Sequence, residues 1–326
     1  MIRSLLSLLR SAPDPRRVVL FALIAVLSLV AGFFTVSPAT AKPLIGAWGY
    51  DYMLGLFALF VVYAWRVGEA RRAVWLGWLR APGWPGVAIA AATAFAIWCD
   101  PFKHKILFDE FVLQGTALQM HATKEIATVI RAYDIAGSWT PIDTFLDKRP
   151  YFFVFLVSLV HDLTGFRIAN LFLVNVALTP VFFALVYWFA REFTGRRGPA
   201  LLAVGLLATM PLLGQNTSGA GMELHNLVMI ALVASLAVLW LRAPDSDRLS
   251  LLVLGAILLG QSRYESTLFI LPTALVIVAG WLRAGRVILS WPAVFAPLFL
   301  VPRVWHQRFL DSSPLLWQPF LGFLLS

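Results

Sequence analysis

Charged residues are scarce in this 326-residue chain, and cysteine is almost absent. Asp, Glu, Lys and Arg make up 13% of the residues and hydrophobic residues 60%, whereas soluble domains are about 25% charged. Such a chain has too little charge to cover a water-exposed surface, which excludes a soluble enzyme, a disordered tail and a basic nucleic-acid module. The single cysteine, Cys99, excludes an intramolecular disulfide framework and a Cys-rich metal site. The composition therefore predicts a polytopic membrane protein.

Long hydrophobic runs are abundant, and a membrane-spanning helix needs about 17–25 such residues. We place nine spans at 18–36, 48–65, 84–99, 165–190, 199–214, 223–241, 249–263, 265–282 and 287–302. A tenth run, 150–163, is bracketed by charged residues and is too short to span, so we expect it to lie in, or dip into, the outer interface. The predicted fold class is an all-α polytopic membrane protein with about nine transmembrane helices.

Positive charges are divided unevenly between the two sets of predicted loops. With a cytoplasmic N-terminus, the inner segments hold 15 arginines and five acidic residues, and the rest of the chain holds 11 cations and 12 acidic residues. Membrane proteins usually carry such an excess of Lys and Arg in their cytoplasmic loops. The net charge of +9 therefore sets topology and is not a sign of an anionic partner. The expected localisation is the bacterial inner (plasma) membrane.

The N-terminus has a second interpretation as a signal peptide. Arg3 and Arg10 precede a hydrophobic run, and Ala39-Thr40-Ala41 has the small residues of a cleavage site. The run is longer than the usual hydrophobic region of a signal peptide, so we favour a first membrane span.

The outer segment between residues 100 and 149 carries seven of the 17 acidic residues. Binding and catalytic residues are frequent in long ordered loops. Hydrophobic residues recur within it at helical spacing: Leu118, Ala122, Ile126, Val129 and Tyr133. We therefore expect an amphipathic helix on the membrane surface, and a helix packed against the spans without any role in binding is an equal alternative.

Asp109 and Glu110 form an acidic pair a few residues beyond the predicted third span. A carboxylate near hydrophobic surface holds its proton more tightly and can serve as a general base. Adjacent carboxylates at a helix N-terminus can equally be charges that stabilise the helix dipole. The two residues alone leave both interpretations open.

Two motifs follow the acidic pair: Ser138-Trp139-Thr140-Pro141 and Asp147-Lys148-Arg149-Pro150, the second leading into the short hydrophobic run. Their order resembles the GT-C class of membrane glycosyltransferases, in particular the family 39-like branch of protein mannosyltransferases and aminoarabinose transferases. That branch has an Asp-Glu pair after a transmembrane helix, a surface helix, a Trp-x-x-Pro-like element, an Asp-Lys-Pro-Pro element and a short hydrophobic helix. A long span ending in a basic turn follows, here at 191–197.

The resemblance covers roughly 84–303 and departs from the branch in two places. Arg149-Pro150 stands where the branch has Pro-Pro, and the stretch from the acidic pair to Lys148 is longer than expected. Both departures weaken assignment to a subfamily more than to the class. The predicted organisation has three parts: two additional spans and a basic cytoplasmic loop in 1–83, a seven-span catalytic module with outer loop 100–164 in 84–303, and an outer apolar tail in 304–326.

The resemblance implies an inverting transfer of a sugar from a polyprenyl-phosphate-linked donor to an acceptor on the non-cytoplasmic face. Asp109 is the expected base, with Glu110 second or orienting. The residues expected to bind the donor phosphate are Lys148, Arg149 and Arg263, because Lys offers a point charge and Arg a bidentate fork. The residues expected to support them are Asp147, Tyr264 and Glu265.

No cofactor is expected. The five histidines lack the spacing of zinc ligands, and Lys and Arg can stabilise a leaving phosphate, so a divalent metal is not favoured although some branches of the class use one. The expected partners are the polyprenyl-phosphate sugar, a lipid, glycan or protein acceptor, membrane lipids and a possible partner subunit, but no nucleic acid.

Two alternatives differ in class. The first is a transporter or flippase of a lipid-linked substrate, which usually has internal repeats; we find no convincing repeat. The second is a non-catalytic core subunit that needs a partner, which the hydrophobic residues near Leu324-Leu325-Ser326 favour.

Overall fold

The computed structural model describes residues 14–70, 72, 76 and 83–311. Its elements are α2 (Pro15–Val30), the π-helix η1 (Ala31–Thr35), α3 (Pro38–Glu69), α5 (Gly83–Trp98), α6 (Leu107–Thr123), β1 (Thr128–Ile135), β2 (Ser138–Phe145), α7 (Phe152–Thr164), α8 (Ala169–Thr194), α9 (Arg197–Ala208), α10 (Pro211–Thr217), α11 (Glu223–Arg242), α12 (Ser246–Gly260), the 3₁₀-helix η2 (Glu265–Phe269), α13 (Ile270–Ala284) and α14 (Trp291–Asp311). The predicted tail beyond 311, Arg3, Arg10 and most of the cytoplasmic loop before α5 lie outside the described residues.

Each predicted span coincides with a helix or with two consecutive helices. Five segments of the described chain are long and hydrophobic enough to cross a membrane: Pro15–Thr35, Pro38–Glu69, Ala169–Thr194, Glu223–Arg242 and Glu265–Ala284. A sixth is added if α9 and α10, which are bent by 72°, form one span. The predicted number of nine is therefore not confirmed. Helices α5 and α12 have 16 and 15 residues and, at about 1.5 Å per residue, fall short of a hydrocarbon core of about 30 Å.

Local signals in the sequence explain where several helices begin and end. Ser37 accepts a hydrogen bond from the Thr40 N–H (3.2 Å), and Pro38 occupies the first turn of α3. Asp245 caps α12 in the same way through the Arg248 N–H (2.9 Å). Helix α8 ends at Gly195, whose φ of 67° is easily adopted only by glycine.

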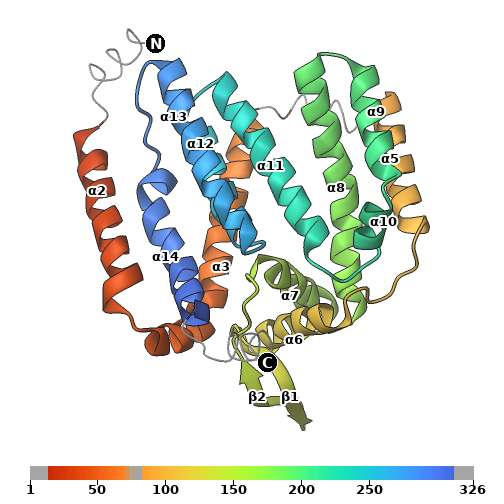
Figure 1. Cartoon of the computed structure of the whole chain (residues 1–326), viewed down its shortest axis with the longest axis vertical. Helices are drawn as coiled ribbons and strands as arrows, with labels where there is room; N and C mark the ends of the chain where they lie inside the picture. The colour runs from red at the N-terminus through yellow and green to blue at the C-terminus, as the bar shows by residue number, and fades with distance from the viewer. Residues whose placement is uncertain (1–13, 71, 73–75, 77–82, 312–326) are drawn as a thin grey trace, which may run out of the picture.

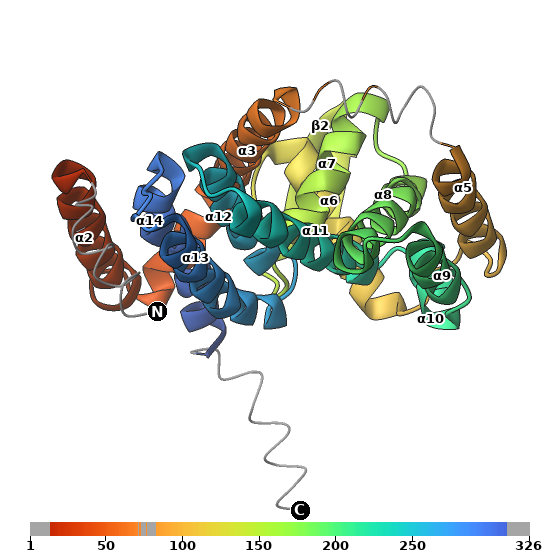
Figure 2. The same ribbon diagram turned by 90° about the horizontal axis from the view of Figure 1, so that it is seen from above.

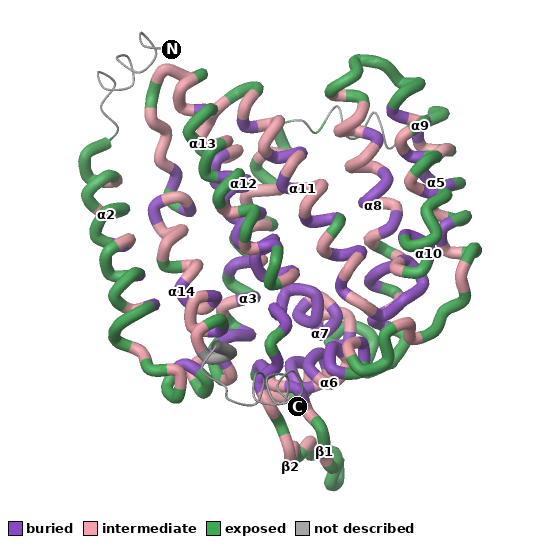
Figure 3. The backbone as a smooth tube through the Cα atoms, in the orientation of Figure 1, coloured by how far each residue is buried: buried purple, intermediate pink, exposed green. Residues whose placement is uncertain are grey.

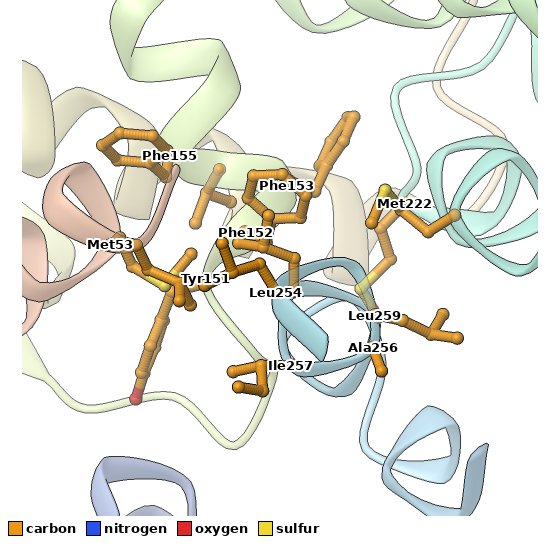
Figure 4. Packing of buried hydrophobic residues seen from close by; sticks show 14 of the residues in the cluster. Met53, Tyr151, Phe152, Phe153, Phe155, Met222, Leu254, Ala256, Ile257 and Leu259 are labelled. Atoms are coloured by element: carbon orange, nitrogen blue, oxygen red, sulfur yellow. The ribbon is translucent and has the colours of Figure 1, made fainter. Parts of the chain in front are cut away.

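Helix α12 and the short helix α7 form the centre of the packed interior (Figure 3). Every residue of α12 from Leu249 to Gly260 is buried. In α7, Phe153 and Phe155 are completely buried, and both pack in the cluster that contains Met53 of α3 and Leu254 of α12 (Figure 4). The run predicted to lie in or dip into the interface is thus a short helix inserted among its neighbours.

The two ends of the bundle differ in character (Figure 1). One end carries the basic segments predicted to be cytoplasmic, where Arg66 pairs with Asp247 (3.2 Å) and Arg242 with Glu192. The other end carries α6, α7 and the β-hairpin. Seen from above, α2 and α5 stand at opposite margins of the row of helices (Figure 2).

The prediction of an amphipathic helix at 118–133 is wrong. Helix α6 ends at Thr123, where Lys124 takes a left-handed conformation with φ of 60°, and residues 128–145 form an antiparallel hairpin. The β-branched run that begins at Thr128 favours a strand. Ala136 and Gly137, with φ of 53° and 83°, form the two-residue loop, because hairpin turns of this length need positive φ. The Trp139 indole N–H donates to Gln119 Oε1 (3.0 Å), which fastens the hairpin to α6.

Candidate active site

Glu110 is a buried carboxylate that holds three segments together. Its side chain is 3% exposed. Its Oε2 lies 3.0 Å from His104 Nδ1 and accepts from the Lys105 N–H (2.8 Å), while its Oε1 accepts from the Ala220 N–H (3.0 Å). These bonds tie the start of α6 to the turn before α11. With its lone pairs engaged, Glu110 is suited to orient the first turn of α6.

Asp109, the neighbouring residue, lies at the surface with 44% of its side chain exposed, and it pairs with Arg149. Arg149 is buried, and its Nη1 donates to both oxygens of Asp147 (2.8 Å each). The backbone N–H of Arg149 also donates to Asp147 (2.9 Å). One guanidinium therefore joins two carboxylates that come from α6 and from the loop before α7. Because two anions already balance its charge, Arg149 is better placed to hold Asp109 than to bind a third anion.

Lys148 and Arg263 are the other two predicted phosphate-binding residues, and they are less constrained. Lys148 is exposed, and among the described residues its side chain has no ion-pair partner. Arg263 pairs loosely with Glu265 (Nε–Oε2, 3.3 Å) and with Glu223 (Nη1–Oε1, 3.7 Å). The predicted contact between Arg263 and Glu265 is therefore present, and Tyr264 between them is exposed.

The sequence allows two roles for Glu223, lining an acceptor pocket or capping a helix, and favours the cap. Glu223 does lie in the first turn of α11, and its carboxylate is close to Gly221. A Cβ added at Gly221 would collide with the Glu223 carboxylate and lie 3.9 Å from Glu110 Oε1. Gly221 therefore lies between the carboxylates of Glu110 and Glu223. No ion pair joins the Asp109–Arg149–Asp147 contacts to those of Arg263 within the described chain.

His306 was also missed, because residues 304–311 were assigned to an outer tail and instead continue α14. Tyr151, which follows Pro150, was given no role. His306 Nε2 lies 2.8 Å from the Tyr151 hydroxyl and 2.8 Å from the Asp147 carbonyl oxygen. Burial, together with the charge of Asp147, raises the pKa of Tyr151 well above its ordinary value, so the phenol stays protonated. Helix α14 therefore contacts the backbone of Asp147 through His306.

The described residues contain no group of three or more His, Cys, Asp or Glu side chains that could hold a metal ion. The polar groups that the fold gathers at this end are carboxylates paired with arginines. Such a set can move a proton and can balance a developing negative charge.

Exchange of Glu110 for Gln tests its orienting role. Gln removes one acceptor that faces the Lys105 N–H, so we expect the free energy of unfolding to fall by about 1–3 kcal/mol. We expect kcat to fall less than when Asp109 is replaced. Thermal unfolding in detergent and the transfer rate check both. The exposed Glu125 offers a matched control, Glu125→Gln. A fully stable Glu110→Gln protein without activity would instead identify Glu110 as the base.

Residues 148–306 match the model of the family described as dolichyl-phosphate-mannose-protein mannosyltransferase. The resemblance found in the sequence is thereby confirmed, and it indicates a membrane glycosyltransferase of the GT-C type. The match begins at Lys148 and includes Arg263, but it does not extend to Asp109 or Glu110. No curated protein and no solved structure matches the chain.

Proposed function

We propose that this chain transfers a sugar from a polyprenyl-phosphate-linked donor to an acceptor on the non-cytoplasmic face of the membrane, with inversion at the anomeric carbon. The observation that carries the proposal is the arrangement of Asp109, Arg149 and Asp147. It places a half-exposed carboxylate, fixed by a buried guanidinium, at the hairpin end of the bundle. A single displacement with one base and one leaving phosphate inverts the sugar carbon.

The reaction needs a base for the acceptor. In the proposed step Asp109 takes the proton of the acceptor hydroxyl or amine as that atom forms its bond to the anomeric carbon. The bond between the anomeric carbon and the phosphate oxygen breaks, and its electron pair leaves with the polyprenyl phosphate. Arg149 keeps Asp109 in one orientation, and Asp147 keeps Arg149 in place.

The leaving phosphate needs positive charge close to it. Lys148 and Arg263 are the candidates, because the first is exposed without an acidic partner in the described chain and the second is held only loosely. Lys148 lies between Asp147 and Arg149 in the sequence, so it is next to the contacts among Asp109, Arg149 and Asp147. Glu265 and Tyr264 would support Arg263, and Asp147 would support Arg149.

The orientation is part of the proposal. The arginine-rich segments favour a cytoplasmic position for one end of the bundle. The hairpin end would then lie on the outer side of the membrane, which in a bacterium is the outer side of the inner membrane. The transfer would then take place on the outer side of the membrane, after the lipid-linked sugar has been moved there from the cytoplasmic side.

A transfer assay with the purified protein tests this function. Protein in detergent, given a polyprenyl-phosphate sugar and candidate acceptors, should release polyprenyl phosphate and form the glycosylated acceptor. Mass spectrometry of the lipids that co-purify should reveal a polyprenyl species. If the donor crosses a proteoliposome membrane without being consumed, the transporter alternative is correct. If neither a bound polyprenyl lipid nor any transfer is found, the proposal fails.

A further inference from the structure

Asn175 is a polar side chain inside α8, a helix that is long and hydrophobic enough to cross a membrane. It is completely buried, and polar groups inside such helices are costly unless they have partners. Its Nδ2 donates to the carbonyl oxygens of Gly219 (3.0 Å) and Gly221 (2.8 Å). Because carbonyl oxygens can only accept, the amide nitrogen of Asn175 must face them. Both donors of Asn175 are therefore used on the loop between α10 and α11.

One peptide group of this loop connects Asn175 to Glu110. The carbonyl of Gly219 accepts from Asn175. The N–H of Ala220, which belongs to the same peptide group, donates to Glu110 Oε1 (3.0 Å). The C=O and N–H of a trans peptide point in opposite directions, and the described residues contain no cis peptide bond. Asn175 and Glu110 therefore hold this peptide from opposite sides, and its rotation would break both hydrogen bonds.

Close packing leaves this peptide little room to move. A Cβ added at Gly219 would lie 2.9 Å from the Gln215 carbonyl oxygen and 3.4 Å from Glu110 Oε1. The first of these distances is shorter than Cβ atoms normally show, and the oxygen belongs to the backbone of α10, which cannot turn aside as the end of a side chain can. The backbone of Gly219 therefore lies directly against α10 and close to Glu110.

We propose that Asn175 is a positioning residue for the transfer reaction. It fixes the peptide between Gly219 and Ala220, and this peptide holds Glu110. Glu110 in turn holds the first turn of α6, in which Asp109 lies. The kinetic part of the inference rests on the proposed function. Without Asn175 the peptide can rotate, Glu110 loses a donor, and the proposed base moves. A displacement of about 1 Å can slow an enzyme about 100-fold.

Replacement of Asn175 by Ala in the full chain, purified in detergent, tests the inference. We expect kcat for sugar transfer to fall about 10–100-fold, the cost of a small displacement of the base. The KM for the polyprenyl-phosphate sugar should change little, because the side chain of Asn175 bonds to the loop and not to Lys148 or Arg263. Initial rates at varied donor concentration, expressed per folded protein, measure both. A wild-type kcat in Asn175→Ala would overturn the inference.

The matched control is Asn170→Ala. Asn170 lies on the same helix and is also completely buried. Its Nδ2 donates to Thr164 Oγ1 (3.0 Å) and to the Gly165 carbonyl oxygen (3.1 Å) at the C-terminal end of α7. The control should therefore lower the Tm much as Asn175→Ala does, but it should keep the wild-type kcat. Equal losses of kcat in the two variants would mean that Asn175 only stabilises the fold, and the inference would be wrong.

A double-mutant cycle tests the route through Glu110. If both residues act through the same peptide, Asn175→Ala combined with Glu110→Gln should lower kcat no further than the more damaging single change. Effects of residues that share no partner are additive in free energy and so multiply in rate. Asn170→Ala combined with Glu110→Gln should therefore give the product of the two single effects. Such a product in the Asn175 pair would show that Asn175 acts by another route and would reject the inference.

Hydrogen exchange at the Ala220 N–H tests the contact without requiring sugar transfer. This N–H should exchange faster in Asn175→Ala than in the wild type, and at the wild-type rate in Asn170→Ala, because only the first change releases the peptide. Unchanged exchange in Asn175→Ala would reject this inference whatever the activity. Faster exchange there, with a wild type that transfers no sugar, would reject the proposed function alone. If Asn175→Ala does not fold, Gly219→Ala should displace the same peptide and give both changes, and wild-type kcat and exchange in that variant would overturn the inference.

Discussion

Replacement of Asp109 by Asn should slow sugar transfer by about 10²–10⁴-fold, the range that general acid–base catalysis contributes. Asn keeps the shape of Asp109 and can still accept from Arg149, so the fold and the Kd of the donor should change little. The loss should therefore appear in kcat. Single-turnover transfer and donor binding, measured on the same preparation, check this expectation.

The matched control for this substitution is Asp134→Asn on the hairpin. Asp134 Oδ1 accepts from the Gly137 N–H (2.8 Å), and Asn can accept the same bond, so this variant should transfer sugar at the wild-type rate. Full activity of Asp109→Asn with Glu110 intact would remove Asp109 from the role of base.

Replacement of Arg149 by Gln should have the largest effect on stability. Asp147 is 90% buried, with 10% of its side chain exposed, and would remain in the interior without its partner. Breaking a buried ion pair from one side costs about 3–5 kcal/mol, so the variant should unfold at a clearly lower denaturant concentration and lose activity. Equilibrium unfolding in mixed micelles measures the first effect, and the transfer assay the second.

The double variant Asp147→Asn, Arg149→Met separates stability from function. Because it removes both charges, it should recover most of the lost stability. It should not recover transfer, because Asp109 would still lack the guanidinium that orients it. If the single variant is as stable as the wild type, the ion pair is not a supporting contact, and the proposed positioning of Asp109 is wrong.

The sequence predicted the hydrophobic helices well, because hydrophobic length and charged boundaries are local properties. Every predicted span lies on a helix, and the acidic pair lies in the first turn of α6 as one of its two interpretations required. The error at 118–133 arose because the same hydrophobic residues satisfy a helical spacing and a strand alternation. Leu118 and Ala122 do lie on α6. The positive φ of Lys124 ends α6, and the Ala136-Gly137 turn makes the residues after it a hairpin. Gly137, which follows a β-branched run, was the signal in the sequence that could have predicted this turn.

The site was predicted in its residues more than in its pairings. Asp109 and Arg149 were expected to act separately, as base and phosphate ligand, yet they contact each other directly although they lie 40 residues apart. No local pattern specifies which cation an acid will meet across that distance. His306 was overlooked because it stood in the predicted tail 304–326, and Arg303, the last residue of the predicted 84–303 module, was given no role. Their spacing of three residues, which places both on one face of a helix, was the signal that could have identified them.

The burial of α7 has a consequence for how the chain can be divided. The ring of Phe57 in α3 packs at an angle against those of Phe152 and Phe155, at centroid distances of 5.8 and 6.0 Å, and the Tyr52 hydroxyl donates to the Phe299 carbonyl (2.6 Å). The segment that matches the family therefore completes its interior with side chains that lie about a hundred residues upstream of the match. Helix α3 is therefore not a detachable extension of that segment. A protein that contained the later helices but lacked α3 would expose the side chains of α7 that pack against Phe57.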